Sequence, residues 1–221
     1  MINIAIDGPA GAGKSTIARR VAHELSYIYV DTGAMYRAMA LYLHRNGIAA
    51  EDTDRIAAAC DGAQISIEYR GGEQIVLLGG ENVNPFLRTQ EVSAMASKSS
   101  AVPQVRTRLV QLQQELAARQ NVVMDGRDIG TVVLPDAQVK IYLTASVEVR
   151  ARRRFLELQE KGESPVLEEI AAEIAERDHR DMTREVSALK QADDAVLVDT
   201  SDMTIEEVSE QILRIVREKT A

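Results

Sequence analysis

The first segment whose residue types could do chemistry is a glycine-rich loop near the N-terminus. It fits the pattern G-x-x-x-x-G-K-[ST] and reads Gly8-Pro9-Ala10-Gly11-Ala12-Gly13-Lys14-Ser15, followed by Thr16. The glycines let successive backbone N–H groups turn toward phosphate oxygens, and the N-terminus of a following helix adds a favourable dipole. Lys14 would reach the β- and γ-phosphates, and the Ser15 hydroxyl would bind Mg²⁺. The loop therefore predicts the binding of a nucleoside triphosphate.

A carboxylate and an arginine follow a later apolar run. Residues 121–125 read as a buried strand that ends in Asp125, a candidate to hold Mg²⁺ through water. An acid at this place can also be an ordinary turn residue. The next segment, Gly126-Arg127-Asp128-Ile129-Gly130, brings a guanidinium fork that matches phosphate oxygens in a bidentate way.

A second polar segment follows the predicted strand Tyr27 to Asp31. It reads Asp31-Thr32-Gly33-Ala34-Met35-Tyr36-Arg37 and opens a helix. The carboxyl ends of parallel strands face the ligand crevice, so Thr32 and Arg37 would point at a substrate. A helix cap followed by a surface arginine explains the same residues equally well.

Two helices with many arginines, predicted at 146–160 and 166–185, form a candidate lid over the phosphates. The first holds Arg150, Arg152, Arg153 and Arg154. On the second, Ile170 and Ile174 define an apolar face that Arg177, Asp181 and Arg184 continue to within about 40°. This spacing predicts that the inward face becomes cationic above an anionic ligand. A solvated surface on the first helix and a charged end that bridges to a neighbour on the second are the alternatives.

The elements that must position these groups alternate between strand and helix. Strands are expected at 2–7, 27–31, 121–125, 139–143 and 196–199, and helices at 14–25, 34–45, 102–119 and 204–219, besides the two of the lid. Between residues 64 and 83 the pattern changes to period-two alternation with tight glycine turns, which predicts a small antiparallel insert. The sequence therefore indicates a three-layer α/β fold with a mostly parallel sheet.

Composition limits the remaining possibilities. The chain has 221 residues, 45% of them apolar, which suffices for one compact domain with a full core. A net charge of −8 argues against binding nucleic acid or an anionic membrane through a global positive field. The single cysteine, Cys60, excludes an internal disulfide and is expected to be a small buried residue. The apolar start contains Asp7 and no basic region, so a cytoplasmic protein is expected.

Along nearly its whole length the chain resembles the bacterial cytidylate (CMP) kinase family of P-loop proteins. The segments that carry this resemblance are residues 6–16, 31–37, 88–92, 125–133 and 176–181. The last two are more specific than the phosphate loop. The resemblance implies a five-stranded parallel sheet, with a core at about 1–31, 101–145 and 185–221, a monophosphate-binding part with the antiparallel insert at about 32–100, and a lid at about 146–184.

The resemblance also implies roles for single residues. Arg37 and Arg127 would hold the CMP phosphate, Thr32, Arg177 and Asp181 the ribose, and Ser97, Arg106, Asp128 and Arg184 the base, with Tyr36 beside them. Many family members carry Ser where this chain has Thr32, and either hydroxyl can donate a hydrogen bond. Lys14, Arg127, Arg177 and Arg154 would act on the transferring phosphoryl group, with residues 8–16 on ATP and Mg²⁺ held by Ser15 and Asp125.

The predicted activity is transfer of the ATP γ-phosphoryl group to CMP or dCMP by a monomer. Two alternatives stay open at this point. The first is a kinase of the same architecture with another small acceptor, such as UMP, a nucleoside or a hydroxy acid. The second is a nucleotide switch that signals to a partner protein, although the guanine-reading tetrapeptide Asn-Lys-x-Asp of GTPases does not occur in the sequence.

Overall fold

The computed structural model describes residues 1–220, and these form two compact units. One unit contains Met1 and the continuous segment Ile28–Gln120. The other contains Ile2–Tyr27 and the chain from Asn121 onward. We call the first of them the insert unit and the second the phosphate-loop unit.

The structure contains the five-stranded parallel sheet that the resemblance implies, and its strand order is β2-β6-β1-β7-β8. Its strands are β1 (Asn3–Asp7), β2 (Ile28–Asp31), β6 (Val122–Gly126), β7 (Val139–Thr144) and β8 (Val196–Asp199). In the phosphate-loop unit, β1 pairs with β6 in a register that sets Ile6 beside Asp125, and with β7 on its other side. Strands β1 and β6 are almost wholly buried, which explains why both read as continuous apolar runs.

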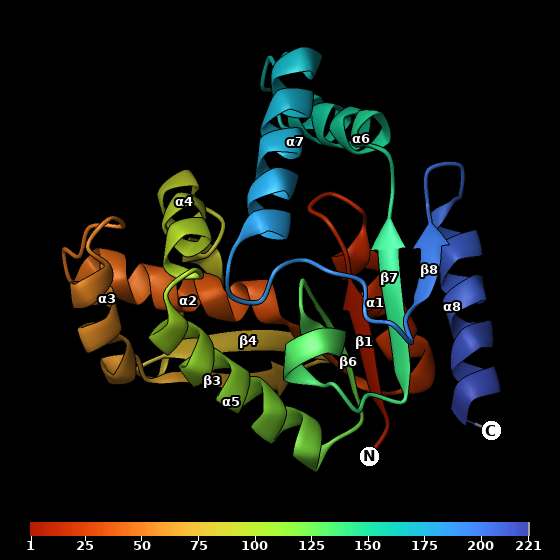
Figure 1. The fold of residues 1–221 in the computed structure, drawn as a ribbon, viewed down its shortest axis with the longest axis horizontal. Helices are drawn as coiled ribbons and strands as arrows, with labels where there is room; N and C mark the ends of the chain where they lie inside the picture. Colours follow the sequence, from red (N-terminus) through yellow and green to blue (C-terminus); the bar gives the residue numbers. More distant parts are fainter. Residues whose placement is uncertain (221) are drawn as a thin grey trace. The chain divides into compact units, whose positions relative to one another are not determined.

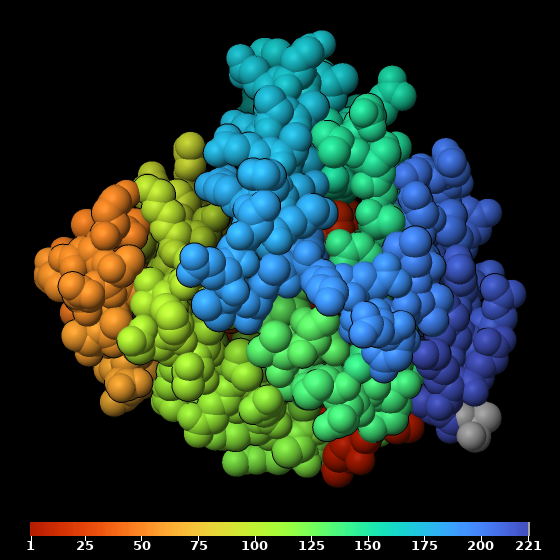
Figure 2. Space-filling view, viewed as in Figure 1, coloured from red at the N-terminus to blue at the C-terminus, as the bar shows by residue number. Residues whose placement is uncertain are grey.

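The helices of the phosphate-loop unit are α1 (Lys14–Leu25), α6 (Val147–Glu160), α7 (Leu167–Thr183) and α8 (Ile205–Thr220). Helices α1 and α8 contact each other, and they pack on β6 and β7 respectively. Helices α6 and α7 lie beside one another beyond the end of β7 (Figure 1). Figure 2 shows a small area of the red N-terminal segment uncovered between the light-blue surface of α7 and the green surface of α6. A short π-helical segment, η3 (Ile129–Val133), follows β6.

The insert unit carries the predicted antiparallel sheet, with the order β3-β4-β5. Its strands are β3 (Ile65–Arg70), β4 (Glu73–Leu78) and β5 (Glu81–Asn82), and its helices are α2 (Thr32–Arg45), α3 (Thr53–Ala59), α4 (Gln90–Ser99) and α5 (Pro103–Arg119), with short 3-10 turns η1 (Cys60–Gly62) and η2 (Asn84–Phe86). The sequence analysis does not predict α3 and α4. Each begins at a side-chain cap: Asp52 accepts from the Arg55 N–H, and Thr89 from the Val92 N–H.

Two smaller expectations concern single features. Cys60 is buried, as predicted, and its thiol donates to the Ala57 carbonyl. Among residues 1–220 no helix is both long and apolar enough to cross a membrane.

Candidate functional site

The phosphate loop joins β1 to α1, which is the setting that the motif requires. Gly8 has φ +147°, and a Cβ atom at this position would lie 1.9 Å from the Leu143 carbonyl oxygen of β7. Gly11 also has a positive φ, of +77°. Only glycine adopts both conformations without strain, and at Gly8 only glycine fits. The loop that leads into α1 therefore passes directly beside the end of β7.

Lys14, the first residue of α1, is buried, with 5% of its surface exposed. Its Nζ donates to the Pro9 carbonyl oxygen at 2.7 Å. Burial lowers the pKa of Lys14 well below its ordinary value, and the positive charges of Arg127 and Arg177 lower it further, while Asp125 and Asp7 oppose them. An anionic ligand at this place would add the negative charge that this cluster of cations lacks.

Ser15 and Asp125 meet at the side of the loop. The Ser15 hydroxyl donates to Asp125 Oδ2 at 2.9 Å, and Asp125 is buried at the end of β6. A hydroxyl and one carboxylate suit Mg²⁺, which keeps several waters and takes its remaining ligands from substrate phosphates. Residues 1–220 contain no group of three or more histidines, cysteines and acids arranged to hold a metal ion by themselves.

Asp7, the last residue of β1, connects the loop to the segment after β6. It is 4% exposed, and its two carboxylate oxygens accept hydrogen bonds from the Ile129 and Gly130 N–H groups at 2.8 and 2.7 Å. Burial raises the pKa of Asp7 from 3.8 to about 6, against the effect of these two hydrogen bonds and of Lys14. The carboxylate fixes the start of η3, and so the backbone next to Arg127 and Asp128.

The raised pKa of Asp7 predicts a pH-dependent contribution to stability. Because the pKa is higher in the folded than in the unfolded chain, this contribution is greatest at low pH and is lost as the pH rises through about 6. An Asp7→Asn variant cannot ionise. Relative to the wild type, its free energy of unfolding is therefore expected to increase by about 1 kcal/mol between pH 5 and pH 8.

Urea titrations of both proteins at the two pH values measure this change. The exposed Asp136 supplies the control, because Asp136→Asn should show no such trend. A difference between Asp7→Asn and the wild type that is the same at pH 5 and pH 8 would contradict the assigned burial effect.

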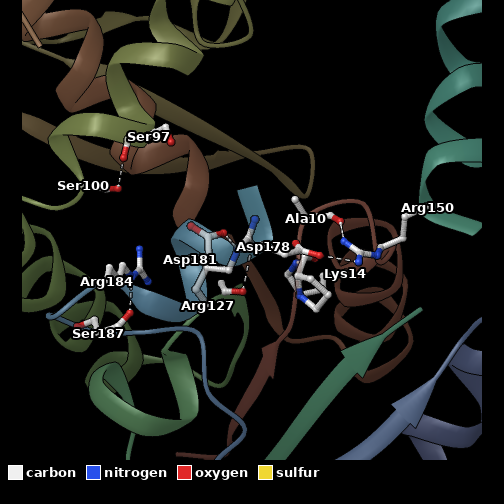
Figure 3. A network of polar contacts seen from close by, with 12 residues as sticks. Ala10, Lys14, Ser97, Ser100, Arg127, Arg150, Asp178, Asp181, Arg184 and Ser187 are labelled. Atoms are coloured by element: carbon white, nitrogen blue, oxygen red, sulfur yellow. Dashed lines mark hydrogen bonds and ion pairs between the residues drawn. The ribbon is translucent and has the colours of Figure 1, made fainter. Parts of the chain in front are cut away.

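Arg127 and Asp181, both predicted to contact the acceptor, are brought together in the phosphate-loop unit (Figure 3). Arg127 Nε donates to Asp181 Oδ2 at 2.9 Å, and its Nη1 donates to the Gly126 carbonyl at 3.3 Å. Asp128, the residue after Arg127, is buried and lies immediately before η3. Arg184 lies at the end of α7, where its Nε donates to the Ser187 carbonyl at 2.6 Å.

The inward face of α7 differs from the prediction. Ile170 is buried and Ile174 half-buried, as expected, but the next buried residue is Asp178, whereas Arg177 is exposed. The buried stripe therefore continues with the acid Asp178 at this turn, while the exposed Arg177 next to it acts with its charge on Lys14. Asp178 continues the spacing of four residues from Ile170 through Ile174, and this signal in the sequence could have identified it.

The arginines of α6 also separate into different environments. Arg150 is buried and pairs with Asp178 at 2.6 Å, a contact that the sequence analysis does not predict. Arg153 donates to the Thr200 carbonyl at 2.7 Å, Arg152 is exposed, and Arg154 forms a surface pair with Glu157 at 2.9 Å. A direct action of Arg154 on the phosphoryl group stays a prediction.

The other predicted acceptor contacts belong to the insert unit. Thr32 is buried at the start of α2, where Asp31 caps the helix by accepting from the Ala34 N–H at 2.9 Å. Arg106 of α5 is buried, and its guanidinium carbon lies 5.6 Å from the ring centre of Tyr36 on α2. The unit thus brings Tyr36 and Arg106 together, as a base-binding surface would require.

Two more predicted residues complete this unit. Ser97, on α4, is exposed, and its carbonyl oxygen accepts from the Ser100 hydroxyl at 2.9 Å (Figure 3). Arg37 lies one turn after Gly33, where a Cβ atom would come within 3.3 Å of its Nη1.

Comparisons with known proteins show the family to which the chain belongs. A protein-family model described as cytidylate kinase matches residues 4–218. A relative named cytidylate kinase from Caldicellulosiruptor saccharolyticus is 50% identical over 214 residues, which are 97% of this chain and 95% of that protein. One of the same name from Lactobacillus johnsonii is 48% identical over 99% of this chain and 95% of that protein.

Solved structures agree with the fold. A gluconokinase from Sinorhizobium meliloti superposes with a TM-score of 0.50 and 15% identity, covering 99% of this chain and 94% of that chain. An uncharacterized protein from Eubacterium ventriosum gives a TM-score of 0.55 and 11% identity, covering 98% of this chain and 99% of that chain. At these identities the likeness concerns the fold alone.

Proposed function

This chain belongs to the cytidylate kinase family and is an ATP-dependent nucleoside monophosphate kinase, and we propose that its acceptors are CMP and dCMP. The observation that carries this proposal is the cluster of cations at the phosphate loop. Buried Lys14 lies within electrostatic range of Arg127 and Arg177, with Asp125 and Ser15 beside it. Such a cluster suits two phosphorylated substrates that meet end to end.

The reaction needs no general base from the protein. The second pKa of a phosphate monoester is about 6, so the attacking oxygen is already anionic at neutral pH. Catalysis then consists of alignment and charge neutralisation. Lys14 would neutralise charge on the transferring γ-phosphoryl group of ATP, and Arg127 with Arg37 would hold the acceptor phosphate in line with it.

Mg²⁺ is the metal that such a site would take. Ser15 would bind it directly, and Asp125 would hold it through water. When bound, the ion would supply positive charge that neutralises the phosphate oxygens of ATP. The 2.9 Å hydrogen bond between these two side chains supports the assignment, because it sets a hydroxyl and a carboxylate next to each other.

Recognition of the base would depend on Asp128. The exocyclic amino group of cytosine donates hydrogen bonds, which a carboxylate accepts, whereas uracil presents a carbonyl oxygen at the same position. Ser97, Arg106 and Arg184 would complete the base site. Thr32, Arg177 and Asp181 would contact the ribose, with Tyr36 beside Arg106, and Arg177 would also act with Lys14 on the transferring phosphoryl group.

The helices α6 and α7 are proposed to act as the lid. Closure over the phosphates would exclude water, which would otherwise accept the phosphoryl group and waste ATP. The position of α7 against the phosphate-loop side of the unit, where Asp178 pairs with Arg150 and Asp181 with Arg127, is compatible with such a cover.

An acceptor panel tests the proposal. ADP release from Mg²⁺-ATP is measured with CMP, dCMP, UMP, AMP or no acceptor. We expect CMP and dCMP to give rates at least tenfold above UMP and AMP, and the reaction without acceptor to be slowest.

Each other outcome has a defined meaning. If another monophosphate gives the highest rate, the kinase assignment stands and the proposed base contacts are wrong. If ADP release is the same with every acceptor and with none, a nucleotide switch replaces the kinase proposal.

A further inference from the structure

Helix α7 is held in place mainly by charged side chains. Of its 17 residues, only Ile170 and Asp178 are buried. Asp181 of the same helix forms a half-buried ion pair with Arg127. With so small an apolar face, α7 depends on its buried ion pair as well as on its packing against α6 to fix its position.

Arg150 is the partner that anchors Asp178. It is 3% exposed, and three atoms of its guanidinium donate to three different parts of the unit. Nε donates to the Ala145 carbonyl after β7 at 2.9 Å. Nη1 donates to the Ala10 carbonyl of the phosphate loop at 2.9 Å, and Nη2 to Asp178 Oδ2 at 2.6 Å (Figure 3). One side chain therefore connects the sheet, the phosphate loop and α7.

The phosphate loop also packs on this side chain. At Gly11 a Cβ atom would lie 3.4 Å from the Arg150 Cβ, so the loop backbone passes close to the first carbon atom of the Arg150 side chain. The planar guanidinium has its donors in fixed directions, and a lysine could not reach all three acceptors at once. The position of Asp178 is therefore defined relative to Ala10 and Gly11.

The stability of the folded protein alone does not explain why the ion pair of Arg150 and Asp178 is buried at this place. Removing two charges from water is costly, and buried ion pairs are often no more stabilising than well-packed apolar residues. Such a pair does specify one arrangement, because either charge without its partner would be left buried and unpaired. Arg177, the next residue before Asp178, is close enough to Lys14 for its charge to act on it.

We propose that Arg150 and Asp178 are positioning residues that fix α7 on the phosphate loop and thereby hold the Arg177 guanidinium beside Lys14. This inference rests on the proposed function, in which Arg177 and Lys14 act on the phosphates. In this proposal the pair holds the helix and is not assigned a contact with either substrate. Its effect on the reaction passes through Arg177.

The first test is Asp178→Asn, which preserves the shape of the side chain and removes its charge. We expect kcat for CMP phosphorylation to fall about 10-fold to 30-fold, with KM for ATP and for CMP changed by less than about threefold. In an Arg177→Ala background the same substitution should lower kcat by less than about twofold. Independent, multiplicative losses in the two backgrounds would overturn the proposal, because they would show that Asp178 does not act through Arg177.

Arg150→Lys provides a second variant, which keeps the positive charge and loses the three-way geometry. We expect the same selective loss of kcat and the same absence of a further loss in the Arg177→Ala background. This variant also serves if Asp178→Asn does not fold. Glu173→Gln is the matched control, since it removes an exposed carboxylate from the same helix and should leave kcat unchanged.

Hydrogen exchange without substrate separates this inference from the proposed function. In Asp178→Asn the amides of residues 167–183 should exchange at least tenfold faster than in the wild type, while those of β1, β6 and β7 stay unchanged. Unchanged exchange in α7 would overturn the anchoring role. If α7 exchanges faster in Asp178→Asn but the wild-type protein phosphorylates no monophosphate, the anchoring role is supported and the proposed function is refuted.

Discussion

Replacing Lys14 with alanine is expected to lower kcat for CMP phosphorylation by about 10³-fold, near the upper end of losses for a single group that stabilises a transition state. The ammonium is the buried cation of the phosphate loop, and its Nζ is held by the Pro9 carbonyl. Two other cations of the unit are engaged elsewhere, because Arg127 is paired with Asp181 and Arg150 with Asp178. Steady-state ADP release at saturating Mg²⁺-ATP and CMP measures the loss.

This variant is expected to fold. Burial disfavours the charged form of Lys14, so its removal relieves a cost in the folded state, and thermal unfolding should show no decrease in Tm. Lys219→Ala, at an exposed lysine on α8, is the control and should keep full activity. A Lys14→Ala protein within tenfold of the wild-type kcat would remove the phosphate-loop assignment.

Asp128→Ala is expected to raise KM for CMP about 100-fold while KM for ATP changes by less than about threefold. A site that is built to hydrogen-bond a substrate group loses much of its affinity when its own partner is removed, by about 1–3 kcal/mol for a base edge and more when buried groups stay unpaired. Initial rates over a grid of both substrate concentrations give the two constants separately. Asp136→Ala, at an exposed acid, is the control.

Asp128→Asn tests the same contact through specificity. The amide N–H can donate to the O4 atom of uracil, which the carboxylate cannot do, so the ratio of kcat/KM for CMP to that for UMP should fall by at least tenfold. Equal increases in KM for ATP and CMP in Asp128→Ala, with an unchanged ratio in Asp128→Asn, would show that Asp128 supports the fold and does not read the base.

Features that depend on neighbouring residues could be predicted from the sequence. The predicted helix 14–25 coincides with α1, because glycine with a positive φ precedes it and Ser26 in the left-handed region ends it. The period-two pattern correctly predicted β3 and β4, whose register sets Ile67 opposite Val76. Helix α4 is not among the predicted elements, although Val92, Met95 and Ala96 have helical spacing and Thr89 is a suitable N-cap.

Contacts between distant segments could not be predicted in the same way. Asp7 reads in the sequence only as an acid that ends an apolar run, yet it accepts from backbone groups 122 and 123 residues later. The pair of Arg150 and Asp178 likewise needs the positions of two helices, which a charge pattern on either helix does not contain. For the site as a whole, the motifs indicate which residues take part, and the fold determines how they are held.

The pairing of β1 has a consequence for how the protein forms on the ribosome. Asn3 pairs with Val122 and Ile4 with Val139, so β1 has no partner in its own unit until the later half of the chain is made. At about 5–20 residues per second, translation from β1 to β6 takes on the order of 6 to 24 s. The insert unit, a continuous segment that ends at Gln120, emerges completely during this delay. The apolar strand before the phosphate loop must therefore stay unpaired and free of aggregation for seconds, and the nucleotide-binding half of the enzyme is the last part to assemble.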